Sequence, residues 1–201
     1  MNLKPDNTCQ KEVEFWQQFY SSGHEFAVMD IQFKCREEWP ATLGNGKKFP
    51  YRHSVRLGYH SKPCTMTIRN KHLQDIYEIN TSIPERQGRE MSKSYSEFPV
   101  KYVDIEQCKD HYQQFFACFT KENKMVAYSN IHVCGEIASI SMILGHWEEQ
   151  KKTGIMVNLM DEMIAFCIEK EIRYLIYHHA DGGTEGLQKF KKMLGFKPVQ
   201  L

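Results

Sequence analysis

Residues 154–169 read GIMVNLMDEMIAFCIE, and this stretch organises the C-terminal half of the chain. Its apolar residues recur at intervals of three and four, which is the spacing of an α-helix. Two neighbouring rows run along one side of that helix: Ile155, Leu159, Met163 and Cys167, and then Met156, Met160, Ile164 and Ile168. So wide an apolar stripe predicts a helix that packs against a sheet over most of its length.

A strand, a second helix and a last strand are expected after this helix. Residues 173–177, RYLIY, have a continuous apolar centre, as in a strand covered on both faces. The apolar side of the next helix is formed by Leu187, Phe190 and Leu194. Gly195 suits the C-terminal stop of that helix, because glycine readily adopts the left-handed conformation found there. The last strand is expected after the glycine.

Three antiparallel strands are expected before the helix. Residues 112–119, 125–133 and 136–144 are apolar or alternating runs separated by short turns. This pattern predicts a meander, in which each strand pairs with the next.

The segment upstream of the meander is predicted to contain a strand and a helix. Residues 65–69 alternate as in a short strand, and residues 71–79 have helical spacing. Asn70 lies between them and is predicted to cap the helix. Residues 84–96 are polar and predict a loop with a short helix.

The first 63 residues are interpreted as an N-terminal extension that packs on a main domain of residues 64–201. Residues 11–20 have helical spacing, and residues 23–35 alternate in part, as in a strand. Residues 40–63 are rich in proline and glycine, which predicts a loop-rich connection.

The composition is that of a globular protein, with 41% hydrophobic and 25% charged residues in 201. The seven cysteines are scattered and form no C-x-x-C motif, so reduced thiols are expected. The nearest approach to a metal-binding spacing is Cys108 with His111 and His132 with Cys134, and no metal site is predicted from it. The first residues do not resemble a signal peptide, and no apolar run is long enough to span a membrane. A cytoplasmic location is therefore expected, without a membrane partner.

Positive charge is concentrated in one region of a chain whose net charge is only +1. No acidic residue occurs between Glu38 and Asp75, and seven basic residues do: Lys47, Lys48, Arg52, Arg56, Lys62, Arg69 and Lys71. One interpretation is a solvated basic face. The other is a site for an anionic group, such as a phosphate, a sugar nucleotide or RNA.

The element order over residues 64–201 resembles the GCN5-related N-acetyltransferase (GNAT) superfamily. Two motifs support the resemblance. Residues 151–156, KKTGIM, stand where the family has R/Q-x-x-G-x-G/A, and residues 193–196, MLGF, match the family's C-terminal LGF. The resemblance implies an α/β fold with a mixed, mostly antiparallel central sheet flanked by helices.

The resemblance also implies a cofactor, acetyl-CoA or another acyl-CoA. A helix N-terminus presents unpaired N–H groups and the positive end of the helix dipole, and both suit a phosphate. The residues expected at the cofactor are Leu144, Gly145, His146, Lys151, Lys152, Thr153, Gly154, Ile155, Met156 and Thr184. Three positions depart from the family: Met156 replaces Gly or Ala, Lys191 replaces a tyrosine that protonates the leaving thiolate, and Thr184 replaces an asparagine.

The catalytic candidates are chosen by their position at strand ends, where the resemblance places the reacting thioester. They are Glu136, His146 and His178, any of which could take a proton from the acceptor amine. Each also has an ordinary interpretation as a surface residue. The candidates for acceptor binding are Arg52, Arg56, Arg86, Arg89, Ser139 and Ser141.

Two functions remain open from the sequence. The first is an acyl-CoA-dependent N-acyltransferase that acetylates the primary amine of a small acceptor by direct transfer, with an anionic acceptor as one option. The second is a GNAT-shaped module that does not use CoA: an aminoacyl transferase, or a domain that binds RNA or protein through the basic residues of 39–74. A homodimer is also left open, because the family's sheet ends in a hairpin whereas only one strand is expected after Gly195.

Overall fold

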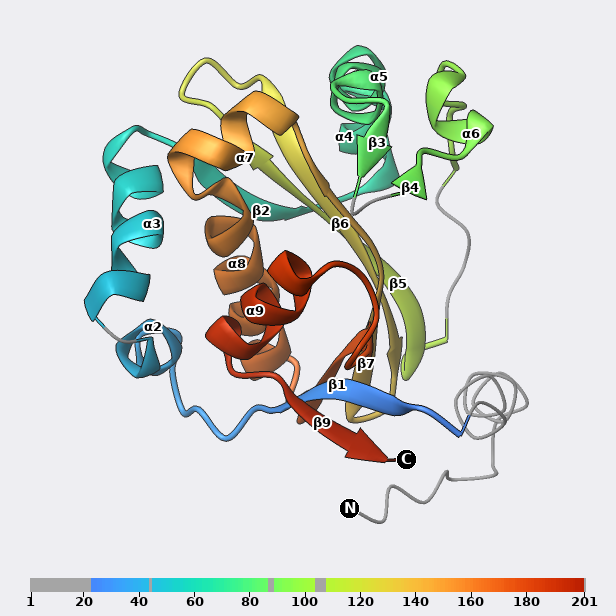
Figure 1. Cartoon of the computed structure of the whole chain (residues 1–201). Helices are drawn as coiled ribbons and strands as arrows, with labels where there is room; N and C mark the ends of the chain where they lie inside the picture. Colours follow the sequence, from blue (N-terminus) through green and yellow to red (C-terminus); the bar gives the residue numbers. More distant parts are fainter. Residues whose placement is uncertain (1–22, 44, 87–88, 104–107, 201) are drawn as a thin grey trace.

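The computed structural model describes residues 23–43, 45–86, 89–103 and 108–200, and it places a seven-stranded sheet at the centre of this part of the chain (Figure 1). The strand order is β2-β5-β6-β7-β8-β1-β9. The bounds are β1 (Glu25–Asp30), β2 (His60–Cys64), β5 (His111–Phe119), β6 (Met125–Cys134), β7 (Ile137–Gly145), β8 (Tyr174–His179) and β9 (Lys197–Gln200). A small ribbon pairs β3 (Glu85–Arg86) with β4 (Arg89–Glu90). Within the described strands only β7 and β8 pair parallel, so the mixed, mostly antiparallel sheet expected from the sequence is confirmed.

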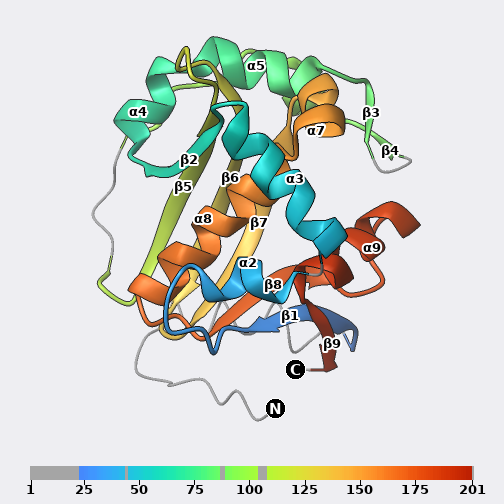
Figure 2. The same cartoon turned by 90° about the vertical axis from the view of Figure 1, so that its left-hand side faces the viewer.

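Helices cover both faces of the sheet (Figures 1 and 2). On one face lie α2 (Glu38–Thr42), α3 (Asn45–Arg56), α7 (Trp147–Thr153), α8 (Ile155–Glu169) and α9 (Glu185–Leu194). On the other face lie α4 (Met66–Lys71), α5 (Leu73–Thr81) and α6 (Lys93–Ser96). We refer to these as the α8 face and the α5 face.

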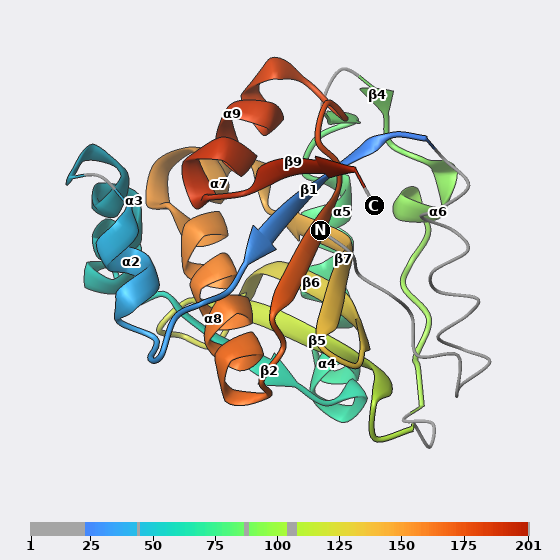
Figure 3. The ribbon, with the colours of Figure 1, turned by 90° about the horizontal axis from the view of Figure 1, so that it is seen from below.

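The strand β1 lies inside the sheet although it comes first among the described strands. It pairs antiparallel with β8 on one side and with β9 on the other (Figure 3). The strand β9 therefore has an antiparallel partner, as the second strand of a hairpin would provide. The partner comes from the N-terminal part of the chain.

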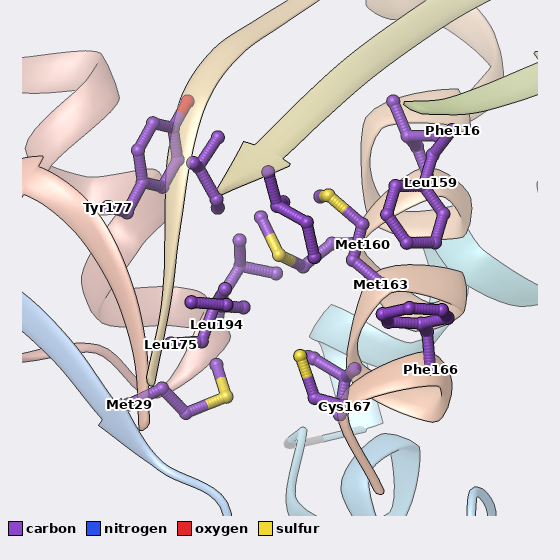
Figure 4. Packing of buried hydrophobic residues seen from close by; sticks show 14 of the residues in the cluster. Met29, Phe116, Leu159, Met160, Met163, Phe166, Cys167, Leu175, Tyr177 and Leu194 are labelled. Atoms are coloured by element: carbon purple, nitrogen blue, oxygen red, sulfur yellow. The ribbon is translucent and has the colours of Figure 1, made fainter. Parts of the chain in front are cut away.

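The α8 face holds the largest apolar core. Ile155, Leu159 and Met163 are fully buried in the first apolar row of α8, as the sequence predicts. They pack with residues such as Phe116 of β5 and Leu175 of β8 (Figure 4). Each large apolar side chain buried in this way stabilises the fold by roughly 2 kcal/mol.

The segment between α2 and α5 differs from the sequence-based expectation. Residues 65–69 were predicted as a strand, but Thr65 caps α4, its Oγ1 accepting a hydrogen bond from Ile68 N at 3.3 Å. The short alternation in TMTIR was therefore misleading, and the strand β2 lies five residues earlier. Asn70 belongs to α4 and does not cap α5, which begins at Leu73 after His72.

The loop predicted for residues 40–63 is also wrong, because it contains α3 and most of β2. Pro50 lies inside α3. The predicted helix at residues 11–20 lies outside the described residues. By contrast, the meander of β5, β6 and β7 and the glycine stop of α9 are confirmed, since Gly195 has φ +101°.

Candidate functional site

The sheet opens where β7 and β8 separate. Their parallel pairing runs from Ile137–Tyr174 to Ser139–Ile176, and both strands continue beyond it. The register between β6 and β7 shifts in the same place, because Ile131 pairs with Ile140 whereas Asn130 pairs with Met142. Ser141 is therefore an extra residue, a β-bulge, which bends β7 away from its neighbour.

A cavity of about 1050 Å³ lies on the α5 face beside this bulge. It is enclosed by the end of β2 with α4, by α5, by residues 94–103, and by the strands β5 to β7. Its lining includes Cys64, Met66, Ile68, Arg69, Ile76, Asn80, Tyr95, Phe98, Val100, Tyr102, Gln113, Gln114, Phe115, Tyr128, Asn130 and Met142. The volume is sufficient for a substrate-sized molecule.

Two polar side chains on β6 define the sheet side of the cavity. The Tyr128 hydroxyl donates to Asn80 Oδ1 at 2.6 Å, and burial raises the pKa of this tyrosine. Asn130 Nδ2 donates to Gln113 Oε1 at 3.3 Å and to Ser141 Oγ at 3.4 Å. Asn130 Oδ1 is buried and has no hydrogen-bond partner among the described residues, so its acceptor capacity is left for a ligand in the cavity that Asn130 lines.

Residues 97–103 form the outer wall of the cavity, and we call them the wall segment. Asn70 holds this segment by two hydrogen bonds, donating from Nδ2 to the Tyr102 carbonyl at 2.5 Å and accepting from Tyr102 N at 3.0 Å. Arg69 Nη1 donates to the Val100 carbonyl at 3.0 Å. The wall is therefore attached to α4.

On the α8 face, protein atoms occupy the space at the N-terminus of α8. The short helix α7 lies between β7 and α8, and Gly154 separates the two helices with φ +72°. A Cβ atom at Gly154 would overlap the main chain of Pro50 in α3. Gly154 was expected to let a phosphate come close to the main chain. In the structure it lets α3 come close instead.

Met156 fills the neighbouring space. A Cβ atom at Gly145 would lie 2.5 Å from the Met156 sulfur, so this side chain packs directly over the end of β7. Ile155 and Thr153 are buried, and Thr153 Oγ1 donates to the Glu149 carbonyl at 2.6 Å. Leu144, half-buried on β7, packs against the separate apolar cluster on the α5 face.

Lys151 and Lys152 are exposed in the last turn of α7. Both pair with Glu148, at 3.5 Å and 3.2 Å, and Lys151 Nζ lies 4.1 Å from the centre of the Trp147 ring. These two cations are the exposed residues of the expected cofactor loop, residues 151–156.

Arg86 lies at the C-terminal end of β7. Its guanidinium donates to the carbonyls of Gly145 and Ile79, at 2.9 Å and 2.8 Å, and to Ser82 Oγ at 2.9 Å. Burial lowers the pKa of Arg86. The structure thus places this expected substrate residue between α5 and β7, where it joins main-chain groups.

The three catalytic candidates do not share one site. Glu136 precedes β7 and His146 follows it, so the nine-residue strand separates them by roughly 30 Å. Glu136 is exposed, and its carbonyl accepts from Arg173 N and Tyr174 N. His178 is exposed, has φ +52°, and lies two residues beyond the last β7–β8 pair.

The expected acceptor-binding residues are likewise divided. Arg52 and Arg56 are exposed on α3, which lies on the α8 face (Figure 2). The cavity lies on the α5 face. Ser141 adjoins the cavity through Asn130, while Ser139 pairs with Ile176 of β8. The main chain of Arg89 belongs to β4, and its side chain lies outside the described residues.

Thr184 and Lys191 hold the two ends of α9. Thr184 is the N-cap, its Oγ1 accepting from Leu187 N at 3.5 Å. Lys191 is buried and donates to the carbonyls of His179 and Gly182, at 2.6 Å and 3.3 Å. Burial lowers the pKa of Lys191, and its ammonium group anchors the loop after β8.

Tyr128, Asn130 and Arg69 carry no sequence pattern that marks them as site residues. Arg69 was visible only as one of seven cations in the basic region. Asn130 and Tyr128 occupy alternate positions of a predicted strand and so share one face of it. The sequence pattern does not show whether that face borders a cavity or bulk solvent.

No group of three or more metal-type ligands occurs among the described residues. Cys108 Sγ lies 3.3 Å from His111 Nδ1, and this contact lowers the pKa of the exposed thiol. In the same part of the chain, no helix has the length and apolarity that crossing a membrane requires.

Comparison with known proteins identifies the fold. No protein-family model matches the sequence, and no curated protein matches it. Among solved structures, FemX is similar with a TM-score of 0.64 and 9% identity, over 90% of this chain and 62% of that chain. The C-terminal DUF2156 domain of a protein from Agrobacterium fabrum, provisionally assigned as a lysylphosphatidylglycerol synthetase, has a TM-score of 0.55 and 13% identity, over 87% and 57%.

A GCN5-related N-acetyltransferase-like protein from Streptococcus suis is similar with a TM-score of 0.49 and 12% identity, over 95% of this chain and 65% of that chain. The chain spans less than two thirds of each of these solved chains. At such identities the likeness concerns the fold alone. This chain has the fold that FemX and the DUF2156 domain share, in agreement with the GNAT-like order of elements expected from the sequence.

Proposed function

We propose that the chain is an acyltransferase that transfers an acyl group to an amine of an acceptor bound in the cavity on the α5 face. The observation that carries the proposal is the position of the cavity. It reaches Met142 and Asn130, next to the bulge at Ser141 where β7 separates from β8. An acceptor in the cavity and an acyl donor in the opening between the strands would meet at β7.

The donor that the geometry favours is an aminoacyl ester. The space beside the N-terminus of α8, where the resemblance predicts the diphosphate of CoA, is filled by the main chain of Pro50 and the side chain of Met156. The name lysylphosphatidylglycerol synthetase, carried by one structural neighbour, also refers to transfer of an aminoacyl group. An aminoacyl-tRNA is the proposed source of that group.

Transfer of an acetyl group from acetyl-CoA is the second candidate. It is supported by Lys151 and Lys152, which remain exposed at the end of α7 and could pair with phosphates there. In either reaction His178 is the proposed base, because it lies nearest to the opening along β8. The ammonium group of the acceptor would lose its proton to this imidazole before attack. The amine then forms an amide bond with the acyl carbon, the bond from that carbon to the donor oxygen or sulfur breaks, and the tRNA hydroxyl or the CoA thiol leaves with a proton.

The experiment compares two radiolabelled donors, aminoacyl-tRNA and acetyl-CoA, each incubated with the purified chain and a pool of amine acceptors. Label is expected to move from aminoacyl-tRNA to an acceptor. Met142→Trp is expected to abolish the transfer by filling the cavity. Val55→Trp is the matched control, because Val55 is 51% exposed on α3.

Three results separate the candidates. Transfer from acetyl-CoA alone would favour the second candidate over the first. If the Met142→Trp variant transfers label as well as the wild type does, the acceptor does not bind in the cavity. No transfer from either donor would contradict the proposed function.

A further inference from the structure

A buried arginine lies in the wall of the cavity. Arg69 is only 8% exposed, although arginine is almost always exposed unless it is paired. It lies in α4, and its guanidinium stands between this helix and the wall segment. Its Cζ atom is 4.2 Å from the centre of the Tyr102 ring, which is a cation–π arrangement.

The partners of Arg69 among the described residues are all uncharged. Nη1 donates to the Val100 carbonyl at 3.0 Å and to Asn70 Oδ1 at 3.2 Å. Within the described ranges, no carboxylate forms an ion pair with this guanidinium. Burial lowers the pKa of Arg69, with only Tyr102 and Tyr128 opposing the shift.

A buried cation without an anionic partner is unfavourable, because it gives up hydration and receives no compensating charge. A cavity beside such a cation supplies the space for the missing anion. We propose that Arg69 binds a carboxylate or phosphate group of the molecule that occupies this cavity. The planar guanidinium suits this role, since Nε and Nη2 can still donate to two oxygens of one oxyanion.

The rest of the lining agrees with an anionic ligand. Glu97 and Lys101, the other charged residues of the lining, are both exposed on the wall segment. On the sheet side, Asn130 Oδ1 offers an acceptor and no charge. If the ligand is the acceptor of the proposed function, on which this part of the inference rests, it has an anionic group at Arg69 and its amine near Asn130.

The test measures direct binding, without any acyl donor. Inorganic phosphate and acetate are titrated separately into the full chain, and the dissociation constants are obtained by calorimetry. Arg69→Met is expected to weaken the binding of the better anion about tenfold or more, the equivalent of one charge-assisted hydrogen-bonded pair. The preference between phosphate and acetate shows which oxyanion the site takes.

Arg173→Met is the matched control, because Arg173 is exposed, pairs with Asp30 and does not line the cavity. It should bind as tightly as the wild type. Equal weakening in both variants, or no binding of either anion to the wild type, would overturn the proposal. If Arg69→Met does not fold, Arg69→Lys decides: weaker binding supports the forked contact, and unchanged binding contradicts it.

The outcome is separable from that of the proposed function. Anion binding that depends on Arg69, without any acyl transfer, would support the anion site and contradict the proposed function. Acyl transfer without anion binding that depends on Arg69 would support the proposed function and contradict the anion site.

Discussion

Two arginines, one on each face of the sheet, show how differently the faces are built. On the α8 face, Arg36 pairs with Asp161 at 2.5 Å and with Glu162 at 2.8 Å. On the α5 face, Arg69 is more deeply buried and pairs with no carboxylate among the described residues. The α8 face is packed, and the buried carboxylate of Asp161 has its cation there. The α5 face is hollow and contains an unbalanced cation, so stability is expected to reside in the first face and binding in the second.

The largest effect is expected at Gly154 on the packed face. Gly154→Val forces a branched residue into φ +72° and drives its side chain into the Pro50 main chain. Backbone strain and overpacking together should cost roughly 3–5 kcal/mol of unfolding free energy, measured by urea denaturation.

Gly135→Ala is the control for this substitution. Gly135 has φ +58°, and a Cβ atom there would meet nothing within 4 Å. It should cost only about 1–2 kcal/mol, the penalty of the left-handed conformation alone. Equal losses at the two glycines would mean that α3 does not press against α8.

An intermediate effect is expected when the balanced charge is broken. Arg36→Met leaves Asp161 buried without its cation and should cost about 2 kcal/mol, less than for a fully buried pair because Arg36 is 43% exposed. Burial is the main cause that raises the pKa of Asp161 above its ordinary 3.8, despite Arg36. The folded state therefore holds this proton more tightly than the unfolded state, and stability from this group falls as pH rises above 3.8.

Removing Arg36 should raise the pKa of Asp161 further. The loss of stability in Arg36→Met should therefore be larger near pH ~7 than near pH ~4, as measured by thermal or urea unfolding. Adding Asp161→Asn should reduce this pH dependence, and the part that remains belongs to Glu162, the other carboxylate that Arg36 pairs with. If the loss of stability is the same at both pH values, Arg36 does not stabilise the charged form of Asp161.

The smallest effect is expected at Tyr128 beside the cavity. Tyr128→Phe removes the hydrogen bond to Asn80, which is only 7% exposed. The expected cost is about 1 kcal/mol, because the cavity gives Asn80 Oδ1 access to a replacement water. A cost as large as that of Gly154→Val would indicate that the α5 face is as tightly packed as the α8 face.

The parts of the fold that could be predicted are those with long, regular patterns. The apolar rows of α8 predicted its buried side because fifteen residues repeat one helical spacing. The meander of β5 to β7 was predicted because each strand is long and separated by clear turns. The five residues TMTIR, in contrast, alternate by chance, and the cap at Thr65 decides in favour of a helix.

The candidate site was predictable only in outline. The sequence pointed to the end of β7, to the glycine at 154 and to a concentration of basic residues. It could not separate Arg69 from the other six cations, because burial depends on the wall segment, which lies about thirty residues further along the chain. It also could not show that Arg86 is already bonded to main-chain carbonyls.

The sequence by itself determined the helical and strand periodicities of the C-terminal half, and with them the GNAT-like order of elements. These are local properties, since each depends on residues only a few positions apart. Tertiary structure decided which neighbour each special residue meets. It set β1 between β8 and β9, brought Pro50 against Gly154, and buried Arg69 beside an open cavity. Such contacts join segments far apart in the chain, so no local pattern specifies them.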